Sequence, residues 1–570
     1  MEVNLKNRIS IAELFFSTLF GIIFGILGLG SIKYLNPNNI DWIKGDNLTS
    51  YIAQIFYVSD KWHYPLLFNP NYGTELSTSL TYTGPASPIL LIQKLFLINP
   101  LFQFYGLWVV LNVILQLLLA IKIAKLLQFS KVQKYSLSLL TLTPFLFFRM
   151  EMHFWLISHF LILWAILNLI RYHKKINLKI VNLSANIVFA YLVNTYIFAM
   201  IFYLYLTIAL HKIICDKSRN SRYYYFFALV TTSLVSIFIF DGFKRQKNTY
   251  ETIKMFLSST YGYHPSNILT WINPSTGLLV ESKGIQNGFD VTNYSLFGIN
   301  LGNIPGDYEG YNYLGIGNII IIILALIFMY QARMKFWKNL MNSKYLLISA
   351  FFIFAFSISY RIGLGATEFV LPFPIYLKWI LGTFRSSGRF LWIISYCIII
   401  LAALVIVQTS RIRRKTASII LAICAIFNLF EISVIEFVRY KKIEATVVNP
   451  ELKTNVPLDF KKIVKKGSLI KIFPQGDVLD NNYANLNYWA WKEDAKTNIL
   501  YTSRINMKEM YRIEQKTYNE LCSGNLLNKD IIVVQKEKLS NFESCDLSKI
   551  QSTVIGNQIF FYNESNDNVN

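Results

Sequence analysis

Long apolar runs separated by clusters of Lys and Arg constrain this chain more than any other feature. A helix needs roughly 20 apolar residues to cross a bilayer, and the run 14–32 (LFFSTLFGIIFGILGLGSI) has that length. We predict about eleven transmembrane helices. They lie at about 14–32, 103–123, 135–148, 154–171, 180–195, 197–212, 223–240, 313–331, 345–359, 389–409 and 416–438.

The basic residues set the expected orientation of these spans. Basic clusters follow every second span, and the positive-inside rule assigns such clusters to the cytoplasm together with the N-terminus. Three long segments, 33–102, 241–312 and 439–570, are then expected outside, with an extracytoplasmic C-terminus and a multi-pass location in the inner (plasma) membrane. The clusters are Lys122/Lys125/Lys131/Lys134, Arg171/Lys174/Lys175/Lys179, Lys212/Lys217/Arg219/Arg222, Arg333/Lys335/Lys338/Lys344 and Arg411/Arg413/Arg414/Lys415.

Composition excludes several classes of protein. Only 15% of the residues are charged and 54% are hydrophobic, whereas a typical soluble domain carries roughly 25% charged residues. The net charge of +22 does not indicate nucleic acid as a partner, because the basic residues alternate with apolar runs instead of forming a binding stripe. Five cysteines without a CxxC or Cys/His cluster argue against structural zinc. We expect membrane lipids as partners and no cofactor.

The C-terminal segment 439–570 differs from the rest of the chain. Short apolar runs such as SLIKIFPQ (468–475), DIIVVQKE (530–537) and NQIFFYNE (557–564) are typical of strands. We therefore predict an all-α polytopic membrane domain over 1–438, with a small extracytoplasmic α/β domain over 439–570. Cys522 and Cys545 both lie in the second domain, where they form either a disulfide or two free thiols.

Ionisable side chains at the expected outer ends of spans are the candidate site residues, since such groups are rare near the membrane and mark sites more often than chance. Several arginines meeting at headgroup depth would suit an anionic, lipid-linked ligand, because the guanidinium group binds phosphate with two parallel hydrogen bonds. The alternative is snorkelling or structural pairing, for example between Arg149 and Glu151. The candidates are Arg149, Glu151, His153, His159, Arg361, Arg385 and Arg389.

The first outer segment supplies a candidate general base. Asp46, in WIKGDNLTSYIAQ, precedes a stretch (49–58) with helical periodicity. A carboxylate beside a reacting hydroxyl is the usual base for a sugar acceptor. Asp41 and Asp60 compete for this role, and a loop aspartate is more often solvated or a helix cap.

Five motifs, spread over most of the chain, resemble one known family. It is a family of bacterial multi-pass membrane proteins of unassigned function, placed within the GT-C superfamily of integral-membrane glycosyltransferases. The stretch Asp290–Pro305, in the expected acceptor-facing loop, shows no family pattern. The motifs are GDNLTSYIAQIFYVSDKWHYPLLFNPNYG (45–73), RMEMHFWLISHFLILWAI (149–166), YGYHPSNILTWINP (261–274), YEGYNYLGIG (308–317) and FRSSGRFLW (384–392).

The resemblance implies a GT-C-like fold and a specific activity. A polyprenyl-phosphate-linked sugar would be the donor, a cell-surface glycan or lipid-linked molecule the acceptor, and transfer would occur on the outer face with inversion. Asp46 would be the base. Arg149, Arg385 and Arg389 would bind the donor phosphate, with His153, His159, Tyr308 and Glu309 as further substrate-binding residues. No metal site is expected, although Asp46 with Glu151 or Glu309 could provide one.

Two other functions remain open from sequence. A flippase or exporter for a lipid-linked glycan would carry its polar groups near the membrane midplane, whereas here they gather toward one face. A non-catalytic accessory protein with a degenerate GT-C fold would keep the helices without the catalytic acid.

Overall fold

The structure is a computed structural model of the full 570-residue chain. It divides into two compact units, each of which is described by itself. The first unit comprises 1–36, 104–235 and 257–447, and the second comprises 37–103, 236–256 and 448–570. The described residues are 9–74, 88–176, 178–215, 223–242, 261–274, 307–331, 344–409, 412–446, 452–474, 482–500, 507–527 and 529–563.

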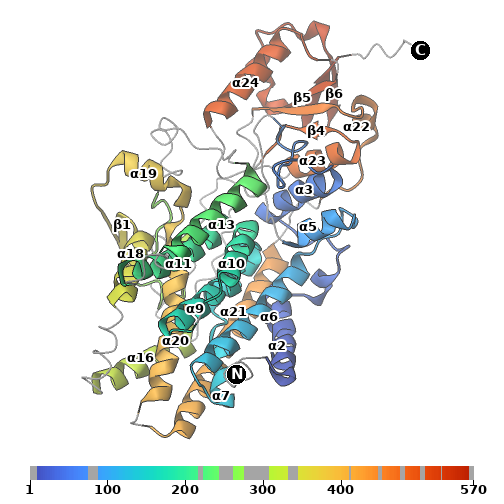
Figure 1. The fold of residues 1–570 in the computed structure, drawn as a ribbon. Coiled ribbons are helices and arrows are strands. Elements are labelled where there is room, and N and C mark those ends of the chain that lie inside the picture. Colours follow the sequence, from blue (N-terminus) through green and yellow to red (C-terminus); the bar gives the residue numbers. More distant parts are fainter. Residues whose placement is uncertain are drawn as a thin grey trace. The chain divides into compact units, whose positions relative to one another are not determined.

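Helices dominate the structure (Figure 1). Six helical segments in the described residues are long and apolar enough to cross a membrane: Ile11–Leu29, Tyr105–Leu126, Thr195–Cys215, Tyr224–Asp241, Ser387–Gln408 and Arg414–Phe437. They belong to α2 (Ile11–Leu29), α6 (Tyr105–Leu126), α11 (Thr195–Cys215), α13 (Tyr224–Asp241), α20 (Leu391–Gln408) and α21 (Arg414–Thr446). Four apolar helices are shorter: α9 (Phe160–His173), α10 (Ile180–Val193), α16 (Ile316–Gln331) and α18 (Lys344–Ile358).

One expected span, 135–148, is not a single helix. The chain forms α7 (Lys131–Leu140) and a separate α8 (Pro144–Met152), with Pro144 at the start of the second helix. Proline lacks an N–H and its ring clashes with the preceding turn, so a continuous helix through Pro144 is unfavourable. The break gives Arg149 a short, buried helix of its own.

The N-terminal helix α2 packs against α6 through glycines. A Cβ atom on Gly25 would lie 2.8 Å from Cγ2 of Val110, so a larger residue would force the helices apart. At the start of α2, the buried carboxylate of Glu13 lies 3.0 Å from Nζ of Lys125 and 2.5 Å from Nζ of Lys134. These contacts fix α2 to α6 and α7.

The second unit contains a mixed five-stranded sheet in the order β4-β3-β5-β7-β6. The first three of these strands run parallel, and β7 is antiparallel to both β5 and β6. The three strands expected from sequence at 468–475, 530–537 and 557–564 are confirmed as β3, β5 and β7. The strands are β3 (Leu469–Phe473), β4 (Lys496–Thr497), β5 (Asp530–Gln535), β6 (Gln551–Ile555) and β7 (Gln558–Tyr562), and the main helices are α22 (Leu458–Ile463), α23 (Asn482–Lys492) and α24 (Met507–Cys522).

The first long inter-span segment belongs to this second unit. It supplies α3 (Asp46–Ser59) and α5 (Pro88–Leu95). Trp491 Nε1 donates to Ser59 Oγ at 2.8 Å, and the Thr497 amide donates to the Asn71 carbonyl at 3.1 Å. Sequence placed the domain boundary at 438/439, whereas α21 continues to Thr446 and the segment 37–103 groups with the C-terminal residues.

Cys522 and Cys545 form a disulfide, with 4.7 Å between their Cα atoms. They pack beside the apolar core of the second unit, next to Leu521 and Phe542. The pairing was one of the two alternatives open from sequence, and the structure decides for the bonded one.

Candidate functional site

A single carboxylate, Glu309, lies between two buried arginines in the first unit. Arg149 is on α8, Glu309 on the short helix α15 (Asp307–Gly310), and Arg389 on the 3-10 turn η5 (Ser387–Phe390). Arg149 Nη1 lies 2.9 Å from Glu309 Oε2, and Arg149 Nη2 donates to the Glu309 carbonyl at 2.9 Å. Arg389 donates from Nε to Oε2 at 2.9 Å, and its Nη2 lies 2.6 Å from Oε1. We call these three residues the Arg–Glu cluster.

Because the Arg–Glu cluster is buried, each of its charged side chains depends on its partners to remain charged. Arg149 is 0% exposed, Glu309 4% and Arg389 7%. A charge buried to this extent is tolerated only when it is paired and hydrogen-bonded. Glu309 is 160 residues from Arg149 in the sequence. The Arg149–Glu151 pairing considered from sequence involves a side chain that lies outside the described residues.

Two glycines let the backbones of the cluster approach closely. Gly388 and Gly310 each adjoin a member of the ion pair, and a Cβ on Gly388 would lie 2.6 Å from the Cα of Gly310. Ser266, in the loop 261–274, has its Oγ 2.9 Å from the Gly310 carbonyl oxygen and 3.0 Å from the Gly388 carbonyl oxygen, so its single hydroxyl proton can be donated to either. The motifs containing these three residues are therefore joined through backbone contacts.

Aromatic rings surround the guanidinium groups. The Arg149 guanidinium lies 4.9 Å from the ring centre of Phe148 and 5.5 Å from that of Trp392. The Arg389 guanidinium lies 4.6 Å from the ring centre of Tyr196 on α11. Such cation–π contacts fix the plane of each guanidinium group.

His159, predicted to bind substrate, is fully buried in this aromatic layer. Its Nδ1 lies 2.9 Å from the Tyr396 hydroxyl, and its ring centre lies 4.3 Å from that of Trp392. Through these contacts His159 supports the ring of Trp392, which in turn contacts the Arg149 guanidinium group.

His264 lies at the edge of the Arg–Glu cluster and is half-buried. Its amide donates to the Arg385 carbonyl at 3.0 Å, and its carbonyl accepts a hydrogen bond from the Gly388 amide at 3.1 Å. The loop 261–274 is thus tied to the segment that carries Arg385 and Arg389.

The pKa of His264 shows that all four charged groups lie within electrostatic reach. Burial lowers this pKa to about 4; the Glu309 carboxylate opposes the shift, while Arg385, Arg389 and Arg149 add to it. A histidine with this pKa is a neutral imidazole near pH 7, able to donate one hydrogen bond and accept another.

The pKa of the Glu309 carboxyl is lowered, whereas the pKa of an isolated buried acid would be raised. Burial acts to raise its pKa, but Arg389 and Arg149, with smaller effects from His153 and His264, hold the pKa well below its usual range. Glu309 is therefore an ionised hydrogen-bond acceptor and not a proton donor at neutral pH.

Arg385 completes the set of predicted arginines. It is half-buried and lies four residues before Arg389. Within the ranges that the structure describes, no carboxylate lies within ion-pair distance of its side chain. Two of the three predicted arginines are therefore bound to Glu309, and the third, Arg385, accepts a backbone hydrogen bond from His264 and has no carboxylate partner among the described residues.

The remaining predicted residues of the first unit are placed as follows. His153 is buried directly after α8. The side chains of Tyr308 and Glu151 lie outside the described residues. Arg361 pairs with Glu368 across a two-stranded hairpin, with 2.9 Å between Nε and Oε1, so it takes no part in the cluster.

The predicted base, Asp46, is the first residue of α3 in the second unit. Its side chain lies outside the described residues. Of its two competitors, Asp60 lies 3.1 Å from Nε2 of His63, and Asp41 is exposed.

Sequence reasoning missed His264. The motif YGYHPSNILTWINP was singled out as a whole, but its histidine was not selected, because nothing local to a loop histidine distinguishes it. The Pro-Ser-Asn that follows His264 could have indicated an ordered loop, since Ser266 and Asn267 both fix the loop through side-chain hydrogen bonds.

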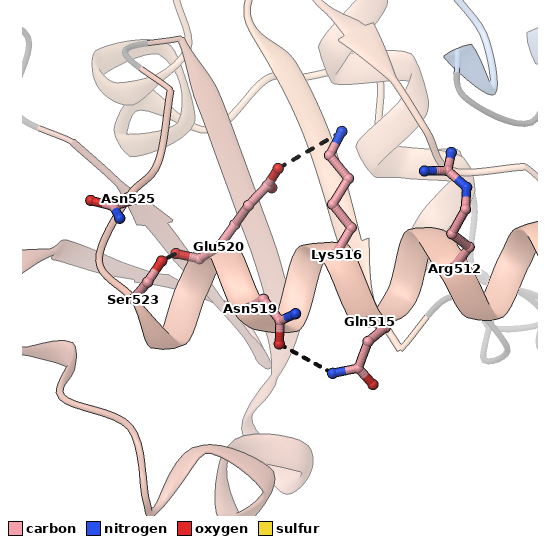
Figure 2. Close-up of a pocket in the computed structure, with 7 residues that line it drawn as sticks. All are labelled: Arg512, Gln515, Lys516, Asn519, Glu520, Ser523 and Asn525. Carbon is pink, nitrogen blue, oxygen red and sulfur yellow. Dashed lines mark hydrogen bonds and ion pairs between the residues drawn. The ribbon is translucent and has the colours of Figure 1, made fainter.

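A separate hollow lies on the polar face of α24 in the second unit (Figure 2). Four of its polar side chains are paired within the helix: Gln515 Nε2 donates to Asn519 Oδ1 at 3.1 Å, and Lys516 lies 3.9 Å from Glu520. These contacts are those of a solvated helix surface, and no ligand is assigned to the hollow. Among the described residues, no group of three or more His, Cys, Asp or Glu is placed to hold a metal ion.

Apolar helices with a buried Arg–Glu cluster define a membrane-associated helical protein with a candidate functional site. The chain belongs to the family described as "Domain of unknown function (DUF6311)", whose model matches residues 18–433. No curated protein matches the chain.

The titration of His264 predicts an acid-sensitive window of stability. Unfolded histidine takes up a proton near pH 6.5, whereas folded His264 does so only near pH 4, so stability should fall as pH decreases between these values. His264→Gln should flatten the dependence of Tm on pH in this window, measured on purified protein in detergent. Protonation of Glu309 should destabilise both proteins only below pH 4.5. Identical slopes for both proteins between pH 6.5 and 4 would contradict the assignment.

Proposed function

We propose that the protein is an integral-membrane glycosyltransferase of GT-C type. It moves a sugar from a polyprenyl-phosphate donor to a cell-surface glycan or lipid-linked acceptor on the outer face of the plasma membrane, with inversion. The observation that carries the proposal is that Arg149 and Arg389 share the buried carboxylate of Glu309, while Arg385, on the same segment as Arg389, has no carboxylate within ion-pair distance among the described residues. Converging arginines are suited to a phosphate group.

The proposed reaction is one displacement at the anomeric carbon. The acceptor hydroxyl oxygen bonds to that carbon while the bond from carbon to phosphate oxygen breaks, and its electron pair leaves with the polyprenyl phosphate. Asp46 takes the hydroxyl proton, and the arginines stabilise the charge that develops on the phosphate. The proposal needs no metal and no cofactor.

A glycan analysis tests this function directly. Mass spectrometry of surface glycans should show a missing or truncated glycan in a deletion strain compared with its parent. Wild-type protein should restore the glycan, whereas Arg389→Lys, which keeps the charge but loses the paired hydrogen bonds, should restore little of it. Arg361→Lys is the matched control and should restore it fully. Unchanged glycans in the deletion strain would reject the proposal.

One observation favours an alternative, the non-catalytic accessory protein. Two of the three arginines are already bound to Glu309, as a purely structural ion pair would be. An accessory protein should tolerate loss of the catalytic acid, so the glycans of an Asp46→Asn strain separate the two functions: they should be truncated for an enzyme and normal for an accessory protein.

The proposal also specifies topology. Basic clusters such as Arg411/Arg413/Arg414/Lys415 are expected in the cytoplasm, which places the C-terminus outside after an odd number of crossings. A reporter that is active only outside the cytoplasm, fused after Asn570, should be active, and a cytoplasm-active reporter at the same site should be silent. The reverse pattern would place the second unit, with Asp46, on the wrong side for the proposed donor.

A further inference from the structure

Residues 361–381, which connect α18 to the segment of Arg385 and Arg389, carry an unusually apolar surface. They form a two-stranded hairpin, β1 (Arg361–Leu364) and β2 (Thr367–Val370), followed by the short helix α19 (Ile375–Leu381). We call them the hairpin–α19 element. Single exposed apolar residues are normal on a protein surface, whereas a run of them marks a contact surface. Six large apolar side chains of the element are 45–62% exposed: Leu364, Phe369, Val370, Leu371, Tyr376 and Ile380.

The length of α18 indicates the depth at which this element lies. The helix begins at Lys344, the last residue of a basic cluster expected in the cytoplasm, and comprises 15 residues, ending at Ile358. Phe351 and Phe352 are 65% and 61% exposed, as in a lipid-facing helix. At about 1.5 Å per residue, α18 is roughly 22 Å long, about 8 Å short of a hydrocarbon core of roughly 30 Å. The chain after Ile358 therefore starts at the far edge of the apolar layer and not in open water.

Two contacts keep the element at the end of α18. The Leu371 amide donates at 2.8 Å to the carbonyl of Tyr360, which lies two residues beyond the end of α18. On α19, Nζ of Lys378 lies 4.2 Å from the ring centre of Tyr360. Strand β1 also packs against α18 (Figure 1). The apolar side chains of the element therefore stay at the depth where α18 ends.

The polar groups of the hairpin are satisfied inside the protein. The buried side chain of Asn267 accepts a hydrogen bond from the Gly365 amide at 3.1 Å and donates to the Gly365 carbonyl at 2.9 Å. The two charged residues of the hairpin, Arg361 and Glu368, pair with each other, with 2.9 Å between Nε and Oε1. Polar groups that are satisfied in this way can lie where water is scarce, as contact with lipid requires.

We propose that the hairpin–α19 element is a lipid-contacting surface, which lies among the phospholipids of the leaflet in which α18 ends, at the boundary between acyl chains and headgroups. Elements of this kind reach about 5–10 Å into that boundary, which matches the length that α18 lacks. Tyr376 suits the position, because tyrosine is enriched at membrane interfaces. A second copy of the chain or another protein would also cover the apolar side chains, but would not account for the short α18. The inference concerns the membrane alone and does not rest on sugar transfer.

Fluorescence quenching measures this depth in the full-length protein. An environment-sensitive fluorophore is attached at Leu371→Cys or at Tyr376→Cys, with Cys215, Cys397 and Cys424 replaced by Ser so that each variant has one free thiol. The labelled protein is placed in phosphatidylcholine nanodiscs that contain a lipid with a nitroxide, either near the headgroup or near the end of the acyl chain. Iodide is the quencher in the water.

We expect both labels to be quenched about twofold more by the nitroxide near the headgroup than by the deep one, and little by iodide. Two reference positions bracket this result. A label at Phe351→Cys, midway along α18, should respond most to the deep nitroxide. A label at Val554→Cys, an exposed residue of β6 in the second unit, should respond to iodide alone.

Polar substitutions test whether the apolar side chains hold the element in place. Leu371→Asp together with Ile380→Asp should lower the quenching of the Tyr376→Cys label by the nitroxide near the headgroup about twofold and raise its quenching by iodide, because a carboxylate is costly in the apolar layer. Val554→Asp together with Leu527→Asp is the matched control, since both residues are exposed in the second unit, and it should change neither value. Thermal unfolding shows that each variant is folded.

Strong quenching of both labels by iodide, with none by either nitroxide, would show that the element lies in water and would overturn the inference. Protection from iodide and from both nitroxides would show that a second copy of the chain or another protein covers the element, which also overturns it. An unchanged signal from the Tyr376→Cys label in the folded Asp variant would show that the apolar side chains do not hold the element at the membrane. None of these results bears on sugar transfer, so the glycan test of the proposed function is independent of them.

Discussion

Asp46→Asn is expected to insert and fold normally but to transfer sugar about 10²–10⁴-fold more slowly than wild type, the usual cost of losing a general base. Asn keeps the size of the side chain but cannot take the proton. Asp46 begins α3, so the variant loses a charge–dipole interaction of about 0.3–1 kcal/mol, too little to unfold the protein. The measurement is transfer from a polyprenyl-phosphate sugar donor by purified protein.

Two neighbouring acids serve as controls for Asp46. Asp41→Asn and Asp60→Asn should transfer at rates close to wild type, because Asp41 is exposed and Asp60 contacts His63 at 3.1 Å. Loss of transfer in one of these variants, with normal transfer in Asp46→Asn, would move the role of base to that residue. Wild-type rates in all three would leave the first inter-span segment without a catalytic acid.

Glu309→Ala is expected to destabilise the protein by about 3–5 kcal/mol, because it leaves two buried guanidinium groups without their shared partner. Arg149 and Arg389 are 0% and 7% exposed, so water cannot readily replace the carboxylate. The measurement is the thermal unfolding of purified protein in detergent, together with the yield of folded protein in membranes.

Glu368→Ala is the matched control for Glu309→Ala. It breaks the Arg361–Glu368 pair, whose side chains are 33% and 24% exposed, so the expected cost is only about 0–1 kcal/mol. Replacing Arg149, Glu309 and Arg389 together by Met should recover much of the stability, since an apolar set can substitute for a buried ion network. That triple variant should still fail to bind lipid phosphate. Equal costs for the two glutamates would show that the cluster is not effectively buried.

The course of the helices was largely predictable from sequence, because apolar length is a local property of the chain. Runs such as 14–32 and 180–195 became α2 and α10 with boundaries shifted by a few residues. The strands at 469–473, 530–535 and 558–562 were equally local, since short β-branched and aromatic runs indicate extended structure. Pro144 was also visible, but the apolar run around it was interpreted as one span instead of the two helices that it separates.

The partners of the site residues could not be predicted, because they are distant in sequence. Glu309 is separated from Arg149 by 160 residues and from Arg389 by 80. Sequence offered only a near neighbour, Glu151, as a partner, and its side chain lies outside the described residues. His264 was missed for a similar reason: its neutral state depends on charges from three other segments.

The sequence by itself determined where the chain is apolar, which segments form helices and strands, and which arginines are unusual for their position. These properties depend on hydrophobicity, charge and proline within some twenty residues. Only the tertiary structure decided that one carboxylate binds two of the three arginines, that Cys522 and Cys545 are bonded, and that the segment 37–103 packs with the C-terminal sheet. Each of these depends on the packing of surfaces from remote segments, where burial decides which charges must be paired.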